Sequence, residues 1–504
     1  MRKAGETWST VPRAAPTLRD DRSWVTFSLL DGRTTHITEF IGKRNRSRLG
    51  VLGALGGAFN GAFRPAAASK RNGDPHEPGE RNPETSRSSR LRRCGTMVDA
   101  RNAPLIGSGW PVVRGAWLDC LNMAETDQFE QRIAAHMQAL DDAGLLRTMH
   151  PPAGLDFTSN DYLCLSQHPL LKAQMIAGVQ AEGVGSTGSR LLRGERDSFS
   201  DLERQFARFK GVERALYFSS GYLANLAVLT TFPRAGDLIA SDERNHASLI
   251  DGVRLSSARR AIFRHHDLAA LTRILDESRP GHAFVVVESL FSMDGDVAPL
   301  AEYASLCRSA GATLIVDEAH AVGIYGRRGS GLVEAVGVNR DVLLTVNTAG
   351  KALGVSGAFV AGPAWAIEYL VQRGRPFIFS TAPPPAVAGA LAASLSIIAA
   401  EPDRRARLAH LARHLRDCLA AEGVPVSPGD SHIVPVVIGE NHRALAVAEA
   451  MQAQGFDVRA VRPPTVPAGT ARLRIAVNIG LDEPTLDRFS LTLAATIQRS
   501  ARGN

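Results

Sequence analysis

Apolar residues in the central part of the chain come in short runs that alternate with amphipathic stretches. Seven runs predict strands: 215–218, 237–240, 261–264, 283–287, 312–316, 342–346 and 357–361. Four stretches between them predict helices: 222–231, 247–257, 268–275 and 300–309. This alternation indicates an α/β fold with a mostly parallel central sheet, in which ligands bind at the carboxyl ends of the strands.

The two ends of the chain follow other patterns. Residues 1–122 are rich in Arg, Ser, Pro and Gly and lack a sustained apolar period, which predicts a disordered extension. Phe129, Ile133, Met137 and Leu140 then form a helical stripe. After a Pro-rich hinge, predicted strands at 433–438 and 472–477 indicate a smaller α/β domain. The expected parts are an extension (1–122), an N-terminal helix and arm (123–165), a large domain (166–385) and a small C-terminal domain (386–504).

The positive charge is concentrated in the front segment. The formal net charge is +7, yet residues 1–122 hold 20 Lys and Arg against 11 Asp and Glu, whereas the remainder holds 38 against 40. The body of the protein therefore has no field that would attract a nucleic acid. Residues 1–122 are either translated upstream sequence before a start at Met123 or an Arg-rich organelle presequence.

Cysteine spacing and hydropathy bear on the compartment. The five cysteines form no C-x-x-C pair and no metal-type spacing, so no metal is expected and a reducing, cytoplasmic location is favoured. The apolar stretch Val51–Phe63 has thirteen residues, too few to span a bilayer. We therefore expect no membrane association.

Lysine is rare after residue 122, where only Lys172, Lys210 and Lys351 occur. The first two lie among polar neighbours on predicted helices and are expected at the surface. Lys351 lies in a small-residue loop directly after the strand predicted at 342–346. Only a primary amine forms an imine with an aldehyde, which makes Lys351 a candidate for attachment of pyridoxal phosphate. The plain alternative is a solvated loop lysine.

Other polar residues follow predicted strands. Asp317 ends one strand and could pair with a pyridinium nitrogen, or simply cap the next helix. His320 could bond a ring hydroxyl, and His246 could stack on a ring or be a surface residue. Ser292 follows another strand, in a segment that could equally be a plain turn.

Two further segments offer sites for anions. Ser219-Ser-Gly-Tyr222 closes a strand and opens a helix, where backbone amides can hold a phosphate. Arg472 and Arg474 lie on the last predicted strand, and we expect them to face opposite sides, one toward a carboxylate and one toward solvent.

As an ordered set, several motifs resemble the α-oxoamine synthases, fold-type I pyridoxal-phosphate enzymes. The motifs are Ser159-Asn-Asp-Tyr-Leu163, Gly185-Ser-Thr-Gly-Ser-Arg190, His246-Ala-Ser248, Phe291-Ser-Met-Asp-Gly-Asp296, Val316-Asp-Glu-Ala-His320, Thr348-Ala-Gly-Lys351 and Pro463-Pro-Thr-Val-Pro467. They cover about residues 123–500, and residues 1–122 have no counterpart.

The resemblance implies a role for each matching residue. Lys351 would bind the cofactor as an imine and remove the substrate's α-proton, and Asp317 would pair with the ring nitrogen. The remaining cofactor contacts would be His246, Ser292, His320, Gly221, Tyr222 and Thr348. The amino-acid carboxylate would meet Arg474 and Asn160, and the acyl substrate would meet Arg147 and Thr465. The family's usual dimer places its sites at the subunit interface.

The implied reaction is a decarboxylative condensation of L-alanine with pimeloyl-CoA or pimeloyl-acyl-carrier protein, giving 8-amino-7-oxononanoate for biotin. Glycine C-acetyltransferase, 5-aminolevulinate synthase and serine palmitoyltransferase are sister activities. Ser189 favours alanine, because glycine-specific aminolevulinate synthases resemble this loop but carry Thr there. A transcription regulator with a pyridoxal-phosphate fold is the remaining alternative, although residues 1–122 show no paired amphipathic helices.

Overall fold

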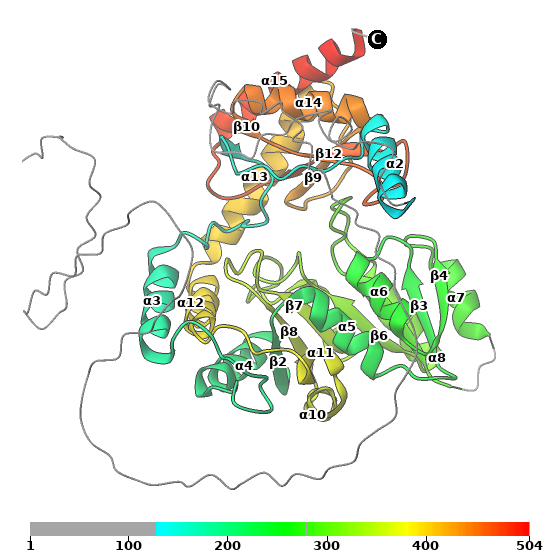
Figure 1. The fold of residues 1–504 in the computed structure, drawn as a ribbon, viewed down its shortest axis with the longest axis vertical. Helices are drawn as coiled ribbons and strands as arrows, with labels where there is room; N and C mark the ends of the chain where they lie inside the picture. The colour runs from blue at the N-terminus through cyan, green and yellow to red at the C-terminus, as the bar shows by residue number, and fades with distance from the viewer. Residues whose placement is uncertain (1–127, 278–280, 503–504) are drawn as a thin grey trace, which may run out of the picture. The chain divides into compact units, whose positions relative to one another are not determined.

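The computed structural model describes residues 128–277 and 281–502. The predicted disorder of residues 1–122 and both interpretations of that segment lie outside this part of the chain. Within it, Figure 1 shows a large sheet with helices around it and a separate small sheet formed by residues near the C-terminus.

The large sheet has seven strands in the order β2-β8-β7-β6-β5-β3-β4. Pairing is parallel from β4 through β7, and β8 runs antiparallel to both β7 and β2. The bounds are β2 Arg214–Phe218, β3 Leu238–Asp242, β4 Arg259–Phe263, β5 Ala283–Glu288, β6 Thr313–Asp317, β7 Val342–Thr348 and β8 Ala358–Gly362. The mostly parallel sheet and all seven predicted strands are thus confirmed.

Helices cover both faces of this sheet, because alternate strand residues point to opposite sides. On β5, Val286 packs in a cluster with α5 and α6, whereas Val285 and Val287 pack in another with α7 and α8. The helices up to the end of the large sheet are α2 Gln128–Asp142, α3 Pro169–Glu182, α4 Asp197–Lys210, α5 Gly221–Thr231, α6 Ala247–Leu255, α7 Leu268–Asp276, α8 Leu300–Ala310 and α9 Leu332–Val336. Burial on both faces explains why these strands are almost continuously apolar.

The C-terminal part contains an antiparallel sheet in the order β11-β12-β9. Its strands are β9 Ile433–Gly439, β11 Ala460–Val461 and β12 Ala471–Ala476, and a separate parallel pair joins β1 Leu155–Asp156 to β10 Phe456–Asp457. The later helices are α10 Ala364–Arg373, α11 Arg375–Ile378, α12 Ala386–Ala400, α13 Pro402–Ala421, α14 Asn441–Ala453 and α15 Glu483–Arg502. Since α12 packs against α3 and α4 while α13 packs against α15, the domain boundaries stay a prediction.

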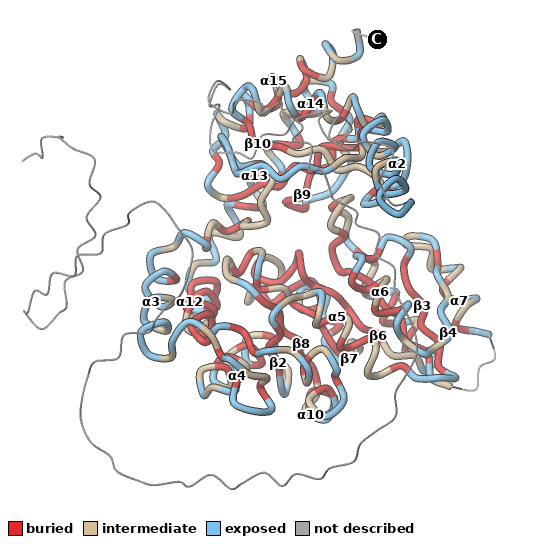
Figure 2. Tube along the Cα trace, viewed as in Figure 1, coloured by how far each residue is buried: buried red, intermediate tan, exposed pale blue. Residues whose placement is uncertain are grey.

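The predicted N-terminal helix is present as α2, but its apolar stripe is not in the core. Phe129, Ile133 and Met137 are 56%, 45% and 48% exposed, and no residue of the helix is buried. Figure 2 shows the contrast between α2, which is mostly pale blue, and the buried central strands. Among the described residues, no helix combines the length and apolar character needed to cross a bilayer.

The expectation that Lys210 lies at the surface is wrong. Its side chain is 3% exposed and its amine forms an ion pair with the fully buried Glu318. The Lys210 amine also donates to the Ser330 carbonyl at 2.6 Å, while the Val333 amide donates to Glu318 at 2.9 Å. The polar neighbours of Lys210 in sequence gave no sign of this partner, which lies 108 positions away.

Replacing Lys210 by alanine is expected to lower the free energy of unfolding by about 3 to 5 kcal/mol, because the Glu318 carboxylate would stay buried without its counter-ion. Lys172 on α3 is exposed, so Lys172→Ala is the matched control and should change stability by less than about 0.5 kcal/mol. Urea unfolding of both variants measures the difference. Equal midpoints for the two variants would refute a structural role for the buried ion pair.

Candidate active site

Lys351 lies in the loop that follows β7, with its side chain half-buried. Its Nζ is 2.8 Å from Nε2 of His320. Burial lowers the pKa of the Lys351 amine to about 8, against the opposing effect of the Asp317 and Glu288 carboxylates. An amine with this pKa is partly neutral near physiological pH, as a nucleophile or a base has to be.

His320 connects this amine to an aromatic hydroxyl. Its Nδ1 lies 2.8 Å from the hydroxyl oxygen of Tyr162, and both rings are buried. Burial, together with the positive charges of Lys351 and Arg474, holds the pKa of His320 well below its usual range. His320 is therefore neutral at physiological pH, with one nitrogen able to donate and the other able to accept.

Asp317 ends β6, beside the end of β7 that leads to Lys351. Its backbone is in register with Val346 of β7, so the two parallel strands bring the carboxylate and the amine to the same edge of the sheet. The buried carboxylate accepts from the Asn225 side-chain amide at 2.7 Å and from the Ala319 backbone amide at 2.8 Å. The second bond closes a local turn, because no helix begins directly after Asp317, and the first comes from the neighbouring helix α5.

The start of α5 lies against the end of β7. A Cβ atom added to Gly221 would lie 2.7 Å from Oγ1 of Thr348, so only glycine lets the two segments approach this closely. Gly221 and Tyr222 thus place helix N-terminal amides beside a hydroxyl, a donor set that suits a phosphate group. Together with the buried carboxylate and the amine, these groups fit pyridoxal phosphate.

His246 and Tyr222 border the same region. Their ring centroids are 6.4 Å apart in an edge-to-face arrangement, and both residues are exposed. The Nδ1 of His246 caps α6 by accepting from the Ser248 amide at 3.2 Å. The His246 backbone amide donates to Glu288 at 2.5 Å, so the loop that carries this ring is tied to β5.

Glu288 was not predicted as a site residue. It is buried at the end of β5, and its carboxylate accepts backbone hydrogen bonds from both His246 and Ser292. Burial and the nearby Asp317 charge raise the pKa of Glu288 to about 8. One side chain therefore holds two of the segments that were predicted to contact the cofactor.

Arg474 reaches from the small sheet toward the loop of Ser292. Its Nε donates to the Ser292 carbonyl at 2.5 Å, and its Nη2 donates to Asn160 Oδ1 at 3.0 Å. The Tyr162 hydroxyl also donates to Asn160 Oδ1, at 2.7 Å. The structure thus brings Arg474 and Asn160 together, although their segments are far apart in sequence.

The expectation that Arg472 and Arg474 face opposite sides is wrong. Residues two positions apart on a strand share a face, and both arginines are buried at 5% and 8% exposure. Arg472 donates to the Asp294 carboxylate at 2.6 Å and to the Met293 carbonyl at 3.3 Å. The two guanidinium groups therefore hold the same turn, and neither points to solvent.

Arg147 and Thr465, the residues predicted to contact the acyl substrate, are both exposed. The Thr465 amide donates to the Arg462 carbonyl at 3.1 Å. Burial, and then the positive charge of Arg147, lowers the pKa of Arg462. Both residues therefore lie beside Arg462, and no hydrogen bond joins them to the residues around Lys351 in the part of the chain that the structure describes.

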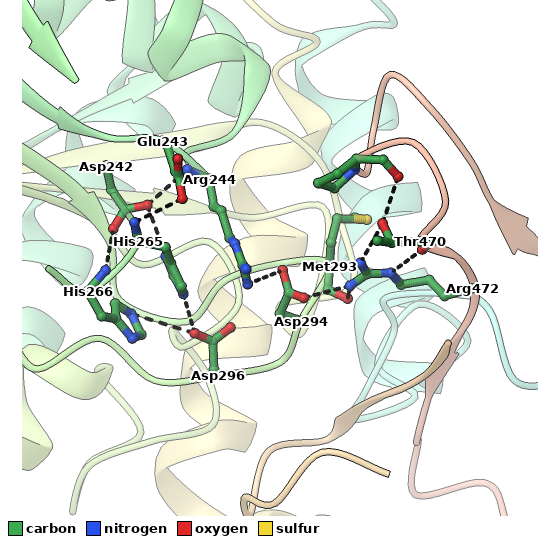
Figure 3. A network of polar contacts seen from close by, with 11 residues as sticks. Asp242, Glu243, Arg244, His265, His266, Met293, Asp294, Asp296, Thr470 and Arg472 are labelled. Carbon is green, nitrogen blue, oxygen red and sulfur yellow. Dashed lines mark hydrogen bonds and ion pairs between the residues drawn. The ribbon is translucent and has the colours of Figure 1, made fainter. Parts of the chain in front are cut away.

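The turn at 292–296 is also held from the large sheet, as Figure 3 shows. His265 lies between two carboxylates, with Nδ1 2.9 Å from Asp242 and Nε2 2.5 Å from Asp296. Only the doubly protonated imidazolium can donate to both. Although burial opposes it, the bonds to Asp242 and Asp296 raise the pKa of His265 to about 9. Arg244, which follows β3 of the same sheet, forms an ion pair with Asp294 at 3.2 Å.

Replacing His265 by glutamine is expected to cost about 1 to 2 kcal/mol of unfolding free energy at pH 6.5, and progressively less as the pH rises through 9. The pKa of His265 is raised on folding, so its stabilisation is complete below the unfolded value and disappears above the folded one. Chemical unfolding of wild type and His265→Gln between pH 6 and 10 measures this. In the double mutant His265→Gln and Asp296→Asn, the loss of unfolding free energy should be smaller than the sum of the two single losses. A loss that does not vary with pH would contradict the charged bridge.

Besides Glu288, the prediction missed Tyr162 and Asn225 as neighbours of the site residues. Tyr162 lies in the Ser159–Leu163 motif that was recognised, but only Asn160 was given a role there. Asn225 lies inside α5, where a polar residue buried to 2% exposure requires a partner. Its partners are Asp317 and Ser248, and nothing in the local sequence identifies them.

Most of the chain is similar to known proteins. The model of the family "Aminotransferase class I and II" matches residues 152–491. An 8-amino-7-oxononanoate synthase from Anaeromyxobacter dehalogenans is 45% identical over 379 residues, which cover 72% of this chain and 95% of that protein. One from Burkholderia cenocepacia is 47% identical over 352 residues, covering 68% and 88%.

Solved structures show the same relationship. A serine palmitoyltransferase from S. paucimobilis with bound pyridoxal phosphate and myriocin has a TM-score of 0.70 at 28% identity, covering 75% of this chain and 100% of that one. An 8-amino-7-oxononanoate synthase from Francisella tularensis has a TM-score of 0.61 at 30% identity, covering 69% and 99%.

Proposed function

Because this chain belongs to the aminotransferase class I and II family and, within it, to the 8-amino-7-oxononanoate synthases, we propose how its own residues carry out that reaction. The family fixes the activity as that of a pyridoxal-phosphate-dependent acyltransferase of biotin biosynthesis, which joins L-alanine to a pimeloyl thioester with loss of CO2. The observation that carries the residue assignment is the half-buried Lys351 amine beside His320, at the sheet edge where Asp317 ends its strand.

The cofactor, when bound, supplies an aldehyde for the amine and a ring that withdraws electrons from the substrate's α-carbon. Lys351 would hold it, and the Asp317 carboxylate would pair with the ring nitrogen. His320 and Ser292 would contact the ring and His246 would stack on it. Gly221, Tyr222 and Thr348 would bind the phosphate. These roles are the ones that the family resemblance implies, and the placement of Lys351, Asp317 and His320 at one edge of the sheet supports them.

Lys351 would also move the substrate's α-proton. Its lowered pKa lets the Nζ atom accept a proton near neutral pH, and the neutral His320 nitrogen at 2.8 Å keeps that atom in place. The other nitrogen of His320 donates to the Tyr162 hydroxyl, whose own proton goes to Asn160, and this contact fixes the orientation of the His320 ring. Proton transfer therefore rests on the half-buried Lys351 amine and on the buried His320 and Tyr162 behind it.

Arg474 and Asn160 would orient alanine by its carboxylate. The guanidinium already donates through Nε to Ser292 and through Nη2 to Asn160, so its position is fixed before substrate binds. Arg147 and Thr465, exposed beside Arg462, would contact the acyl chain or its carrier. A cationic group there suits the free carboxylate of a pimeloyl chain.

The assignment also includes a homodimer and a cytoplasmic location. The exposed stripe of α2, with Phe129, Ile133 and Met137, supports a homodimer, because a stable monomer seldom leaves such a stripe in water. We place the sites at the subunit interface, as the family resemblance implies. The free cysteines Cys164, Cys307 and Cys418 support the cytoplasmic location.

Product formation from a panel of substrates tests this function. Purified protein with pyridoxal phosphate is given alanine, glycine or serine, together with pimeloyl, acetyl, succinyl or palmitoyl thioester, and the amino ketones are measured by mass spectrometry. We expect kcat/KM for alanine with a pimeloyl thioester to exceed every other pair by about 100-fold or more. Preference for serine with palmitoyl thioester would instead favour the activity of the structural relatives at 28% identity.

A further inference from the structure

The helices α13 and α15 pack against each other in the C-terminal part of the chain (Figure 1). On α13, His410, His414 and Cys418 follow one another at intervals of four residues, so they lie on one face of that helix. On α15, Glu483 and Asp487 have the same spacing. Two rows of polar side chains therefore meet between the helices, away from the residues assigned to the active site.

The two turns of this contact differ in chemistry. At the first, Nε2 of His410 lies 2.5 Å from Oε1 of Glu483, a contact between two side chains only. At the second, Nε2 of His414 lies 2.7 Å from Oδ1 of Asp487, and a thiol joins them. The Sγ atom of Cys418 is 3.4 Å from the His414 nitrogen and 3.2 Å from the Asp487 oxygen.

We propose that His414, Cys418 and Asp487 form a binding site for a zinc ion that bridges α13 and α15. Imidazole nitrogen, thiolate sulfur and carboxylate oxygen are the ligand types that Zn²⁺ takes in proteins. In a tetrahedral shell with bonds of about 2.0 to 2.3 Å, neighbouring ligand atoms are roughly 3.3 to 3.6 Å apart. The three separations of 2.7 to 3.4 Å approach this arrangement, so only small side-chain movements are needed.

The position of the site supports metal binding as well. Its ligands come from two helices of 20 residues each, which hold the side chains at fixed spacing. His414 is 26% exposed and Asp487 is 53% exposed, so an ion and a water as fourth ligand can enter from solvent. The Zn–S bond would form as the thiol proton leaves to solvent. The ion would then cross-link α13 to α15.

A second cluster of potential ligands, Asp242, His265 and His266, does not carry the same inference. His265 already uses both ring nitrogens as donors to carboxylates, so no lone pair is left for a metal. The spacing of His414 and Cys418 was not recognised in the sequence because the third ligand lies 69 residues beyond Cys418.

The test uses the enzyme loaded with pyridoxal phosphate and treated with a chelator, so that Lys351 and its neighbours are occupied. Zn²⁺ is titrated against a competing fluorescent indicator, and Co²⁺ is added in parallel because a cobalt–thiolate bond gives a charge-transfer band in the near ultraviolet. We expect one Zn²⁺ per chain and a cobalt band in the wild-type protein. Cys418→Ser should remove the cobalt band and weaken Zn²⁺ binding about tenfold or more. Asp487→Asn should weaken Zn²⁺ binding by a similar factor.

The neighbouring pair supplies the matched control. Glu483→Gln removes the carboxylate charge that faces His410 on the same two helices but leaves the three proposed ligands, so it should bind Zn²⁺ like wild type. Condensation activity is measured for every variant and should be unchanged in Cys418→Ser, which separates this proposal from the assignment of the active site. Binding that survives in Cys418→Ser, or the lack of a thiolate band with cobalt, would overturn the proposal.

Discussion

Replacing Lys351 by alanine is expected to lower kcat by at least about 10³-fold, because the variant loses both the amine that binds the cofactor aldehyde and the base that takes the α-proton. The purified variant should also lack the visible absorption band of the cofactor-bound enzyme. The absorption spectrum and the rate of amino-ketone formation from alanine and a pimeloyl thioester measure the two effects.

Two further variants show what the amine contributes. Lys351→Arg keeps a positive charge beside Asp317 and Glu288 but cannot form an imine, so it should be as inactive as Lys351→Ala. Lys172→Ala changes an exposed lysine and should retain both the band and the activity. Turnover by Lys351→Arg at a tenth of the wild-type rate or more would show that the imine is formed elsewhere.

Replacing Asp317 by asparagine is expected to lower kcat by about 10²- to 10³-fold while the protein stays folded. Asparagine keeps the shape of the side chain and can still accept the 2.8 Å bond from the Ala319 amide. It cannot supply the negative charge that keeps a pyridinium nitrogen protonated, and this protonation makes the ring an electron acceptor. Steady-state kinetics with saturating cofactor, together with the thermal unfolding midpoint, separate loss of chemistry from loss of structure.

The neighbouring amide gives the matched comparison for this variant. Asn225 donates to Asp317 Oδ2 at 2.7 Å, so Asn225→Ala removes a hydrogen bond but leaves the charge. It should reduce kcat much less than Asp317→Asn. If both substitutions had the same small effect, the charge of Asp317 would not be needed and its proposed role would be wrong.

The central sheet could be predicted from the sequence because its physical cause is local. Strands buried on both faces, such as Ala283–Glu288, must be continuously apolar, and the amphipathic stretches between them must be helices. The burial of residues on β12, the middle strand of the small sheet, was harder to predict, since Arg472 and Arg474 are polar residues buried by bonds to a distant turn. Hydrophobic pattern alone does not show burial of this kind.

The same distinction holds for the site. Lys351, Asp317 and His320 could be selected because parallel strand ends gather at one edge, and the structure places them together there. Glu288 and Tyr162 could not, because their importance depends on partners 42 and 158 positions away. Lys210 was misjudged for the same reason, since its charge is matched by Glu318 across the fold.

The scarcity of lysine has a practical consequence for chemical labelling. Of the three lysines in the described residues, Lys210 is held in a buried ion pair and Lys351 would carry the cofactor, which leaves Lys172 as the open amine. An amine-directed dye or surface tether would therefore attach to this region at one point on α3. Labelled at that point with the cofactor bound, this region would keep its reactive lysine out of the coupling chemistry.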